Sequence, residues 1–190
     1  MSSQLDPHVC LSEPKLSFHP ERHTDRDIHP LLGLLRFGPY SSGLMPDPIR
    51  VATIAPTNES QLLYGFMKEL NSPTKATERA DYLPDWPGFH SVFGLHMRAA
   101  GGACHVELDG ALEGEFQESS RPHVVLAERL VRAIQSLDAR RLEFDVLFIY
   151  IPRRWFAGYT GGPDDDFDLH DHLKAFAAAR RLPVQLVRED

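Results

Sequence analysis

The stretch FDVLFIYIP, residues 144–152, is the part of the sequence that decides the fold. It contains an unbroken apolar run, residues 146–151, made of aliphatic and aromatic side chains, and Pro152 ends this run. A continuous apolar run of this length is typical of a strand that is covered on both faces, as the strands of parallel sheets are. We therefore expect a buried strand at this place in the chain.

Two more runs of the same kind lie on either side of it. IRVATIAP, residues 49–56, comes before it, and PVQLV, residues 183–187, comes after it. Apolar residues at three- and four-residue spacing predict helices between the runs, in the stretches 62–70, 122–139 and 168–181. Strands that alternate with helices predict an α/β domain with a mostly parallel sheet flanked by helices. Two shorter strands are expected at residues 92–97 and 104–108.

Residues 1–48 have a different character. Seven prolines interrupt this part of the chain, and no helical period is sustained in it. We expect an irregular arm with one short strand at residues 15–18 and one helical turn at residues 30–35. Between Leu31 and Phe37 the arm has five large apolar side chains, which would form an unusual exposed patch on a soluble monomer. The arm is therefore expected to pack against a domain formed by residues 49–190.

Composition and charge exclude several classes of protein. The chain is 42% apolar and 25% charged, as in soluble globular proteins, and no apolar run is long enough to span a membrane. Cys10 and Cys104 are too few for a disulfide framework or a four-thiolate zinc site, so we expect reduced thiols in a cytoplasmic protein. The net charge of −7 argues against a protein that coats duplex nucleic acid, but not against a local pocket for an anion.

The helix predicted at residues 168–181 carries a candidate anion site. His170 and Lys174 are four residues apart, so they lie on one face of this helix near its amino end. Asp168 is placed to cap the helix, with Asp171 as its partner. An imidazole, an ammonium group and the free amides of a helix amino end all favour an anion. Gln185, on the following strand, is expected to reach the carboxyl edge of the sheet.

Ligands of parallel sheets bind beyond the carboxyl ends of the strands. Two loops qualify for this role, residues 56–60 after the first strand and residues 152–167 after the second. The second loop contains rings and guanidinium groups that can hold an unstacked base, namely Arg153, Arg154, Trp155 and Tyr159. A less specific interpretation stays open, in which these polar residues are only a solvated surface.

The order of a buried strand, a proline, a long loop, His-x3-Lys and then a glutamine on the next strand resembles the MID domain of Argonaute/Piwi proteins. The segments LSF (residues 16–18) and HPLLGLLRFGPYSS (residues 29–42) resemble the region that precedes MID in prokaryotic Argonautes. PDWPGFHSVFG, residues 84–94, resembles a turn in the same group. The likeness is to a short prokaryotic Argonaute that lacks its PIWI domain.

This resemblance implies a Rossmann-like MID domain at residues 49–190 that binds the 5′ end of a guide strand. It implies that His170, Lys174 and Gln185 ligate the 5′-phosphate, and that the loop with Arg153, Arg154, Trp155 and Tyr159 contacts the first base. It also implies a Mg²⁺ ion that bridges the guide phosphate. A fourth phosphate ligand of the family, a lysine, would lie beyond Asp190.

The implied partners are a single-stranded guide RNA or DNA with a 5′-phosphate, a PIWI domain and an associated effector protein. The implied role is guide-directed defence against invading DNA in prokaryotes, with no membrane involved. The PIWI region that would carry nuclease chemistry in this family is absent from the sequence, so the chain is expected not to be an enzyme by itself. Nothing in the sequence has the order of a serine–histidine–acid triad or of a phosphate-binding loop.

Two other interpretations stay open. A metal-dependent hydrolase could use the alternating acids and imidazoles of one cluster, Asp164, Asp166, Asp168, His170 and His172. Alternatively, the apolar arm at residues 31–37 could dock a partner protein, in which case the chain is an interaction module without a ligand of its own. A 5′-phosphate on an oligonucleotide would change binding only under the guide-end hypothesis.

Overall fold

The computed structural model describes residues 13–41, 43, 45–80, 82–162 and 165–189, and the chain divides into two units. The small unit comprises Met1–Leu44 and Lys75–Trp86, and the sheet unit comprises Met45–Thr74 and Pro87–Asp190. The division after residue 44 lies close to the boundary expected after residue 48. The sequence did not indicate that Lys75–Trp86 joins the small unit.

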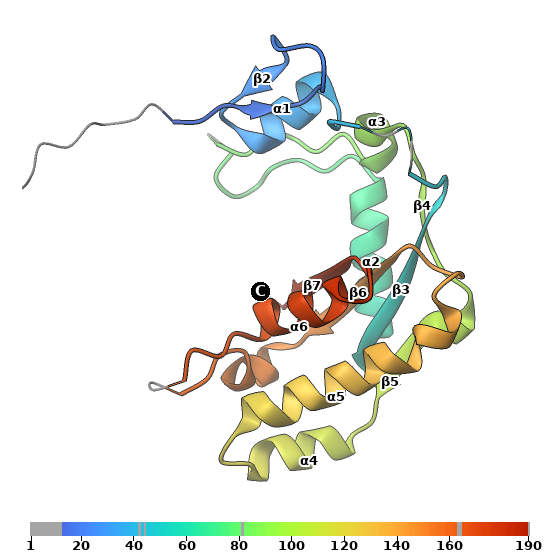
Figure 1. Cartoon of the computed structure of the whole chain (residues 1–190), viewed down its shortest axis with the longest axis vertical. Coiled ribbons are helices and arrows are strands. Elements are labelled where there is room, and N and C mark those ends of the chain that lie inside the picture. Colours follow the sequence, from blue (N-terminus) through green and yellow to red (C-terminus); the bar gives the residue numbers. More distant parts are fainter. Residues whose placement is uncertain (1–12, 42, 44, 81, 163–164, 190) are drawn as a thin grey trace, which may run out of the picture. The chain divides into compact units, whose positions relative to one another are not determined.

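The sheet unit is built on one parallel sheet (Figure 1). Its five strands are β3 (Ile49–Pro56), β4 (Met97–Ala99), β5 (His105–Leu108), β6 (Val146–Ile151) and β7 (Val184–Arg188). β3 pairs with β6 on one side, β6 pairs with β7, and the short strands β4 and β5 pair with successive halves of the other side of β3. All these pairings are parallel, which confirms the prediction of an α/β domain with a mostly parallel sheet.

Helices cover both faces of this sheet. One face carries α4 (Ala111–Glu118), α5 (Pro122–Ser136) and α6 (Leu169–Ala178), and the other carries α2 (Ser60–Asn71). Successive residues of a strand alternate between the two cores, so Leu147 and Ile149 face α5 and α6 whereas Phe148 and Tyr150 face α2. Among the described residues, no helix is both long and apolar enough to cross a membrane.

The structure corrects two details of the sequence prediction. The strand expected at residues 92–97 begins only at Met97, as β4, because Val92 lies in the short helix α3 (Phe89–Phe93), which ends at Gly94 with φ at +67°. The prediction also missed α4, in which Leu112 and Phe116 are the only buried residues and Gly114 interrupts the helical pattern. Short 3-10 turns follow α5 (η2, Asp138–Arg140) and β6 (η3, Arg153–Gly158), and another precedes β5 (η1, Gly102–Cys104).

The small unit pairs β1 (Leu16–Ser17) antiparallel to β2 (Arg26–Asp27) beside the helix α1 (Pro30–Phe37). Phe18 is buried against Gly33, where a Cβ atom would lie 2.1 Å from the Phe18 ring. The Phe37 ring is half-buried, with its centroid 6.0 Å from that of Phe18. The imidazole of His29 contacts the Tyr82 carbonyl at 3.1 Å, which ties Lys75–Trp86 to this unit. Packing of the arm against the sheet unit stays a prediction.

Candidate nucleic-acid interface

The carboxyl edge of the sheet is the place to look for a ligand site. Because the strands are parallel, β3, β6 and β7 all end at this edge, and the loop after β6 extends over it. The helix α6 begins here because it runs back after that loop. The imidazole of His123, in the first turn of α5, packs at a tilt against the ring of Phe167 in the loop, so α5 also begins at this edge.

Two residues of the loop after β6 are used to hold it in place. The Trp155 side chain is buried, and its Nε1 donates to Glu113 at 3.1 Å. The Arg154 guanidinium donates to Glu59 and to Glu113, in each case at 2.6 Å. Burial leaves the Trp155 ring without a surface for a base, which argues against the predicted contact. The carboxylates already neutralise Arg154.

Two other arginines of this edge have no ion pair to their guanidinium groups among the described residues. The Arg188 guanidinium, at the end of β7, lies 4.7 Å from the ring centroid of Phe156 and 4.9 Å from that of Tyr159. The backbone amide of Arg153 donates to Glu189 at 2.7 Å, which places Arg153 beside the end of β7. In the described part of the chain, neither guanidinium has an ion pair.

Tyr159 belongs to the same group of side chains. Burial raises the pKa of Tyr159, and the nearby carboxylate of Asp168 raises it further, so its hydroxyl stays protonated and can donate. The side chain of Tyr159 is half-buried, and Arg188 covers its ring. The sequence prediction included Tyr159 and Arg153 but missed Arg188. We name this set the edge cluster: Arg153, Phe156, Tyr159 and Arg188.

The amino end of α6 adjoins the edge cluster. Asp168 caps the helix by accepting from the Asp171 amide at 3.0 Å, as the sequence predicts. The Leu169 amide donates to the Tyr159 carbonyl, which holds the helix end against the loop. The His170 side chain is part-exposed, and its Nδ1 lies 2.9 Å from Asp171 Oδ1. The amides of Leu169 and Asp171 already have acceptors. We therefore expect the His170 amide to be the donor of this helix end that binds an anion.

The structure places Lys174 and Gln185 away from this edge. Lys174 Nζ donates to the Val184 carbonyl, and Gln185 Nε2 donates to the Leu186 carbonyl at 2.9 Å. Val184 and Leu186 belong to the core that α6 covers, so Gln185, between them, leaves the sheet from the opposite face.

Gln185 is also the second residue of β7 and pairs with Phe148. Its position differs from the expectation that its amide reaches the carboxyl edge. No hydrogen bond or ion pair joins the side chains of His170, Lys174 and Gln185 to one another within the described ranges. Their common role as phosphate ligands stays a prediction.

Asp168, His170 and Asp171 form a group that a metal ion could use. Each offers one ligand atom, and these atoms lie within 4.8 Å of one another. The carboxylates suit Mg²⁺, which prefers oxygen ligands, whereas the imidazole does not. These three residues lie close together also for a reason that involves no metal ion. Asp168 caps the helix by accepting from the Asp171 amide, and the Asp171 carboxylate contacts His170.

The hydrolase hypothesis named a wider cluster. Asp168 and His170 belong to the three-residue group, but Asp166 and His172 do not. The His172 ring instead faces that of Phe167, with 5.4 Å between the centroids. Asp164 lies outside the described residues. Of the five residues that the hydrolase interpretation names, only Asp168 and His170 belong to the metal-binding group found among the described residues.

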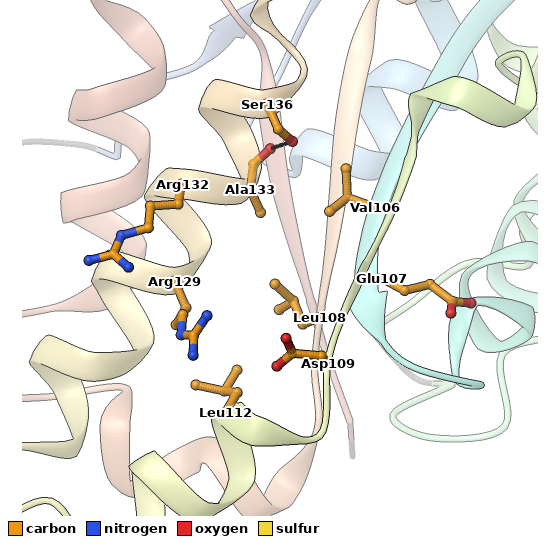
Figure 2. A pocket seen from close by; sticks show the side chains of 9 residues that line it. All are labelled: Val106, Glu107, Leu108, Asp109, Leu112, Arg129, Arg132, Ala133 and Ser136. Atoms are coloured by element: carbon orange, nitrogen blue, oxygen red, sulfur yellow. Dashed lines mark hydrogen bonds between the residues drawn. The ribbon is translucent and has the colours of Figure 1, made fainter.

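A separate pocket lies between β5, α4 and α5, away from the edge cluster (Figure 2). Its volume is about 230 Å³, and Leu108, Leu112 and Ala133 supply apolar lining. Arg129 and Asp109 flank the hollow in Figure 2, and the Arg129 guanidinium pairs with Glu115. Because a carboxylate already neutralises this cation, the pocket offers less to an anion than the edge cluster does.

No protein-family model matches the chain, and no curated protein matches it significantly. The functional argument therefore depends on the physical character of the carboxyl edge. This edge offers two guanidinium groups without ion pairs in the described part of the chain, two aromatic rings and the first turn of a capped helix. These groups can hold a phosphate and the flat face of a base.

Proposed function

We propose that the sheet unit binds the 5′-phosphorylated end of a single-stranded nucleic acid, RNA or DNA, at the carboxyl edge of its sheet. The observation that carries this proposal is the position of Arg188, whose guanidinium lies over two rings and has no ion pair among the described residues. Arginines in folded proteins usually pair with acids, as Arg50 and Arg154 do here. Arg188 is therefore available to an anion that arrives from outside.

In this proposal the phosphate lies between Arg153, Arg188 and the His170 amide. Guanidinium groups bind phosphate through paired, charge-assisted hydrogen bonds, which supports a cation pair as the core of the site. The Tyr159 hydroxyl donates to the same group. The first base stacks on an exposed guanidinium or ring face of the edge cluster, a contact that tolerates any base.

A Mg²⁺ ion implied by the family resemblance would rest on Asp168 and Asp171, whose ligand atoms lie within 4.8 Å of each other at the amino end of α6. It would neutralise part of the negative charge of the phosphate, which the carboxylates of this edge would otherwise repel. Asp168 retains its capping bond to the Asp171 amide in that arrangement. The phosphate contacts of Arg153 and Arg188 do not depend on the ion.

The wider role that we propose follows the resemblance to short prokaryotic Argonautes. The chain serves as the guide-end module, without catalysis of its own, beside a PIWI domain and an effector protein in cytoplasmic defence against invading DNA. The parallel sheet with its ligand edge supports this role, as does the order of motifs from Leu16 to Gln185. The positions of Lys174 and Gln185 do not add to that support.

Fluorescence anisotropy with 5′-phosphorylated and 5′-hydroxyl oligonucleotides of one sequence tests the proposal. Arg188→Gln should weaken binding of the phosphorylated strand about tenfold or more, since charge-assisted hydrogen bonds contribute about 1.5–3 kcal/mol each. The matched control is Arg180→Gln, because Arg180 also lies over a ring, that of Phe176, but beyond the other end of α6. Equal losses for both oligonucleotides, or equal losses in both variants, would contradict the proposal.

A further inference from the structure

A second cavity opens on the carboxyl edge, between the amino end of α5 and the loop after η3. Its volume is about 420 Å³, and its lining includes Arg121, His123, Thr160 and Asp165. Thr160 follows Tyr159, whose ring lies under Arg188. The cavity and the edge cluster are therefore neighbours along one short piece of chain.

His123 is the unusual member of this lining. It is the second residue of α5, and only 9% of its side chain is exposed. Its ring packs against Phe167 with 5.2 Å between the centroids, and its Nε2 is buried without a hydrogen-bond partner among the described residues. Buried polar atoms of folded proteins nearly always have a partner, so this nitrogen calls for an explanation.

The group nearest to that nitrogen is the carboxylate of Asp165. Asp165 Oδ2 lies 3.1 Å from His123 Nε2, which is an ion-pair distance, but the alignment does not make a hydrogen bond. The other carboxylate oxygen accepts from the Phe167 amide at 3.1 Å. The Asp165 side chain is 40% exposed, so solvent reaches this carboxylate although it does not reach the imidazole nitrogen.

Backbone hydrogen bonds of the described loop residues bring Asp165 to this position. The Gly161 amide donates to the Phe167 carbonyl at 2.8 Å, and the Asp165 amide donates to the Gly162 carbonyl at 2.9 Å. A Cβ atom at Gly161 would lie 2.7 Å from Asp165 Cγ, so a glycine is needed for this approach. Asp165 is thus an internal anion that these contacts hold beside a buried imidazole.

The donors around the cavity all favour an anion. Arg121 is exposed at the N-cap of α5, and no ion pair to its guanidinium occurs within the described residues. The fifteen-residue helix α5 directs its positive dipole end to the same place, and no side chain caps it. The imidazole of His123 is the third donor. The carboxylate of Asp165 is misaligned with His123 and cannot accept from all of these donors.

We propose that this cavity is a second phosphate site, which takes the phosphodiester that follows the 5′-phosphate of the bound strand. The incoming phosphate displaces Asp165 from His123 and accepts hydrogen bonds from His123 Nε2, Arg121 and the His123 amide. This inference depends on the proposed function, because the strand must first be held by its 5′ end at the edge cluster. Asp165 acts as a competitor that keeps the site closed to weaker anions.

Isothermal titration calorimetry with two probes tests the inference. Adenosine 5′-monophosphate has one phosphate, and the 5′-phosphorylated dinucleotide pApA has a second one, one nucleotide further along the strand. The wild-type protein should bind pApA about tenfold more tightly than the mononucleotide. A pApA analogue with a neutral methylphosphonate linkage keeps the second base and should lose this advantage.

Variants give the sign of each contribution. Arg121→Gln should remove most of the advantage of pApA, and Asp165→Asn should raise the affinity for pApA severalfold, with the mononucleotide affinity unchanged in both. The control is Arg132→Gln, since Arg132 is an exposed arginine of the same helix that pairs with Glu128. His123→Gln should resemble Arg121→Gln, and circular dichroism would establish that this variant folds.

The outcomes separate the two proposals. If the mononucleotide binds and Arg188→Gln weakens it, but pApA binds no better than its methylphosphonate analogue, the second site is refuted and the guide-end function stands. An unchanged or lowered pApA affinity in Asp165→Asn would also overturn the second site. If neither probe binds the wild-type protein, both proposals are refuted.

Discussion

The two edges of the sheet use arginine in opposite ways. At the amino edge, where β3 and β6 begin, the Arg50 guanidinium forks onto Asp145 at 3.0 and 2.9 Å, and Asp145 also accepts from the Arg50 amide at 2.8 Å. At the carboxyl edge, Arg188 lies over the rings of Phe156 and Tyr159, with no carboxylate paired to it in the described part of the chain. The first arrangement is complete without a ligand, whereas the second is not.

This difference shows where the fold is stabilised and where it is free to bind. The Arg50–Asp145 pair joins the second residue of β3 to the residue before β6, so its removal should affect folding. Arg188 follows the last buried residues of an edge strand, so its removal should affect binding. Not every cation of the carboxyl edge is available for a ligand. Arg154 forms ion pairs with Glu59 and Glu113, as Arg50 does with Asp145.

The largest expected effect is on stability at the amino edge. Asp145→Ala should lower the free energy of unfolding by about 2–3 kcal/mol, because it leaves a half-buried guanidinium and a backbone amide without their acceptor. Urea denaturation followed by circular dichroism measures this change. Arg188→Gln is the control and should change the free energy of unfolding by less than about 0.5 kcal/mol. Similar losses in the two variants would remove the distinction between the edges.

The second expected effect is on binding and separates geometry from resemblance. His170→Ala should change binding of a 5′-phosphorylated oligonucleotide little, because the proposed phosphate ligand is the His170 backbone amide, which alanine keeps, and the imidazole contacts Asp171. Gln185→Ala should leave it unchanged, since Gln185 leaves the sheet from the face opposite α6. Lys174→Ala should also change it little, because Lys174 is bonded to the Val184 carbonyl.

The family resemblance expects all three of these variants to weaken binding. Anisotropy titrations of the three proteins against one phosphorylated oligonucleotide decide between the two expectations. Tenfold losses in Lys174→Ala and Gln185→Ala would show that both side chains rearrange to reach the phosphate. The result would then contradict the proposal that the edge cluster provides the main phosphate contacts.

The smallest expected effect is a dependence of stability on pH at the amino edge. The hydrogen bonds from Arg50 hold the pKa of Asp145 below its ordinary value of 3.8. A carboxyl group with a depressed pKa in the folded state contributes stability that is present above the unfolded pKa and is lost as the pH falls through the folded pKa. The stability difference between wild type and Asp145→Asn should therefore be constant above about pH 5 and shrink below about pH 4.

Urea midpoints measured for both proteins between pH 3 and pH 6 check this dependence. The difference between the two proteins cancels the titration of the other carboxylates. A difference that grows as the pH falls would mean that Arg50 does not stabilise the charged form of Asp145. Arg188→Gln should show no such dependence, because no carboxylate within the described residues pairs with Arg188.

Local patterns in the sequence were enough to predict much of the sheet unit. The apolar runs predicted β3, β6 and β7, and the polar spacing around Asp168 predicted the cap of α6. These features depend on neighbours within one strand or one helical turn, which a sequence displays directly. The helix α4 escaped prediction because its apolar pattern is only two residues long.

The candidate site was harder to predict because it depends on contacts between distant segments. Arg188 belongs to the candidate site because its guanidinium lies over the rings of Phe156 and Tyr159, which are in the segment after β6. In the sequence, a lone arginine at the end of a strand gives no indication of such contacts. Gln185 was misplaced because spacing does not say which face of a sheet the preceding helix covers. The alternation of Val184 and Leu186 around Gln185 was the available signal.

The most direct test of the central claim is an NMR titration of the ¹⁵N-labelled protein with adenosine 5′-monophosphate. Amide signals of Arg153, His170 and Glu189 should move in proportion to binding, because these residues surround the proposed phosphate at the carboxyl edge. Signals of Arg50 and Asp145, at the amino edge, should stay in place. Shifts confined to the amino edge, or no shifts at millimolar nucleotide, would contradict the account.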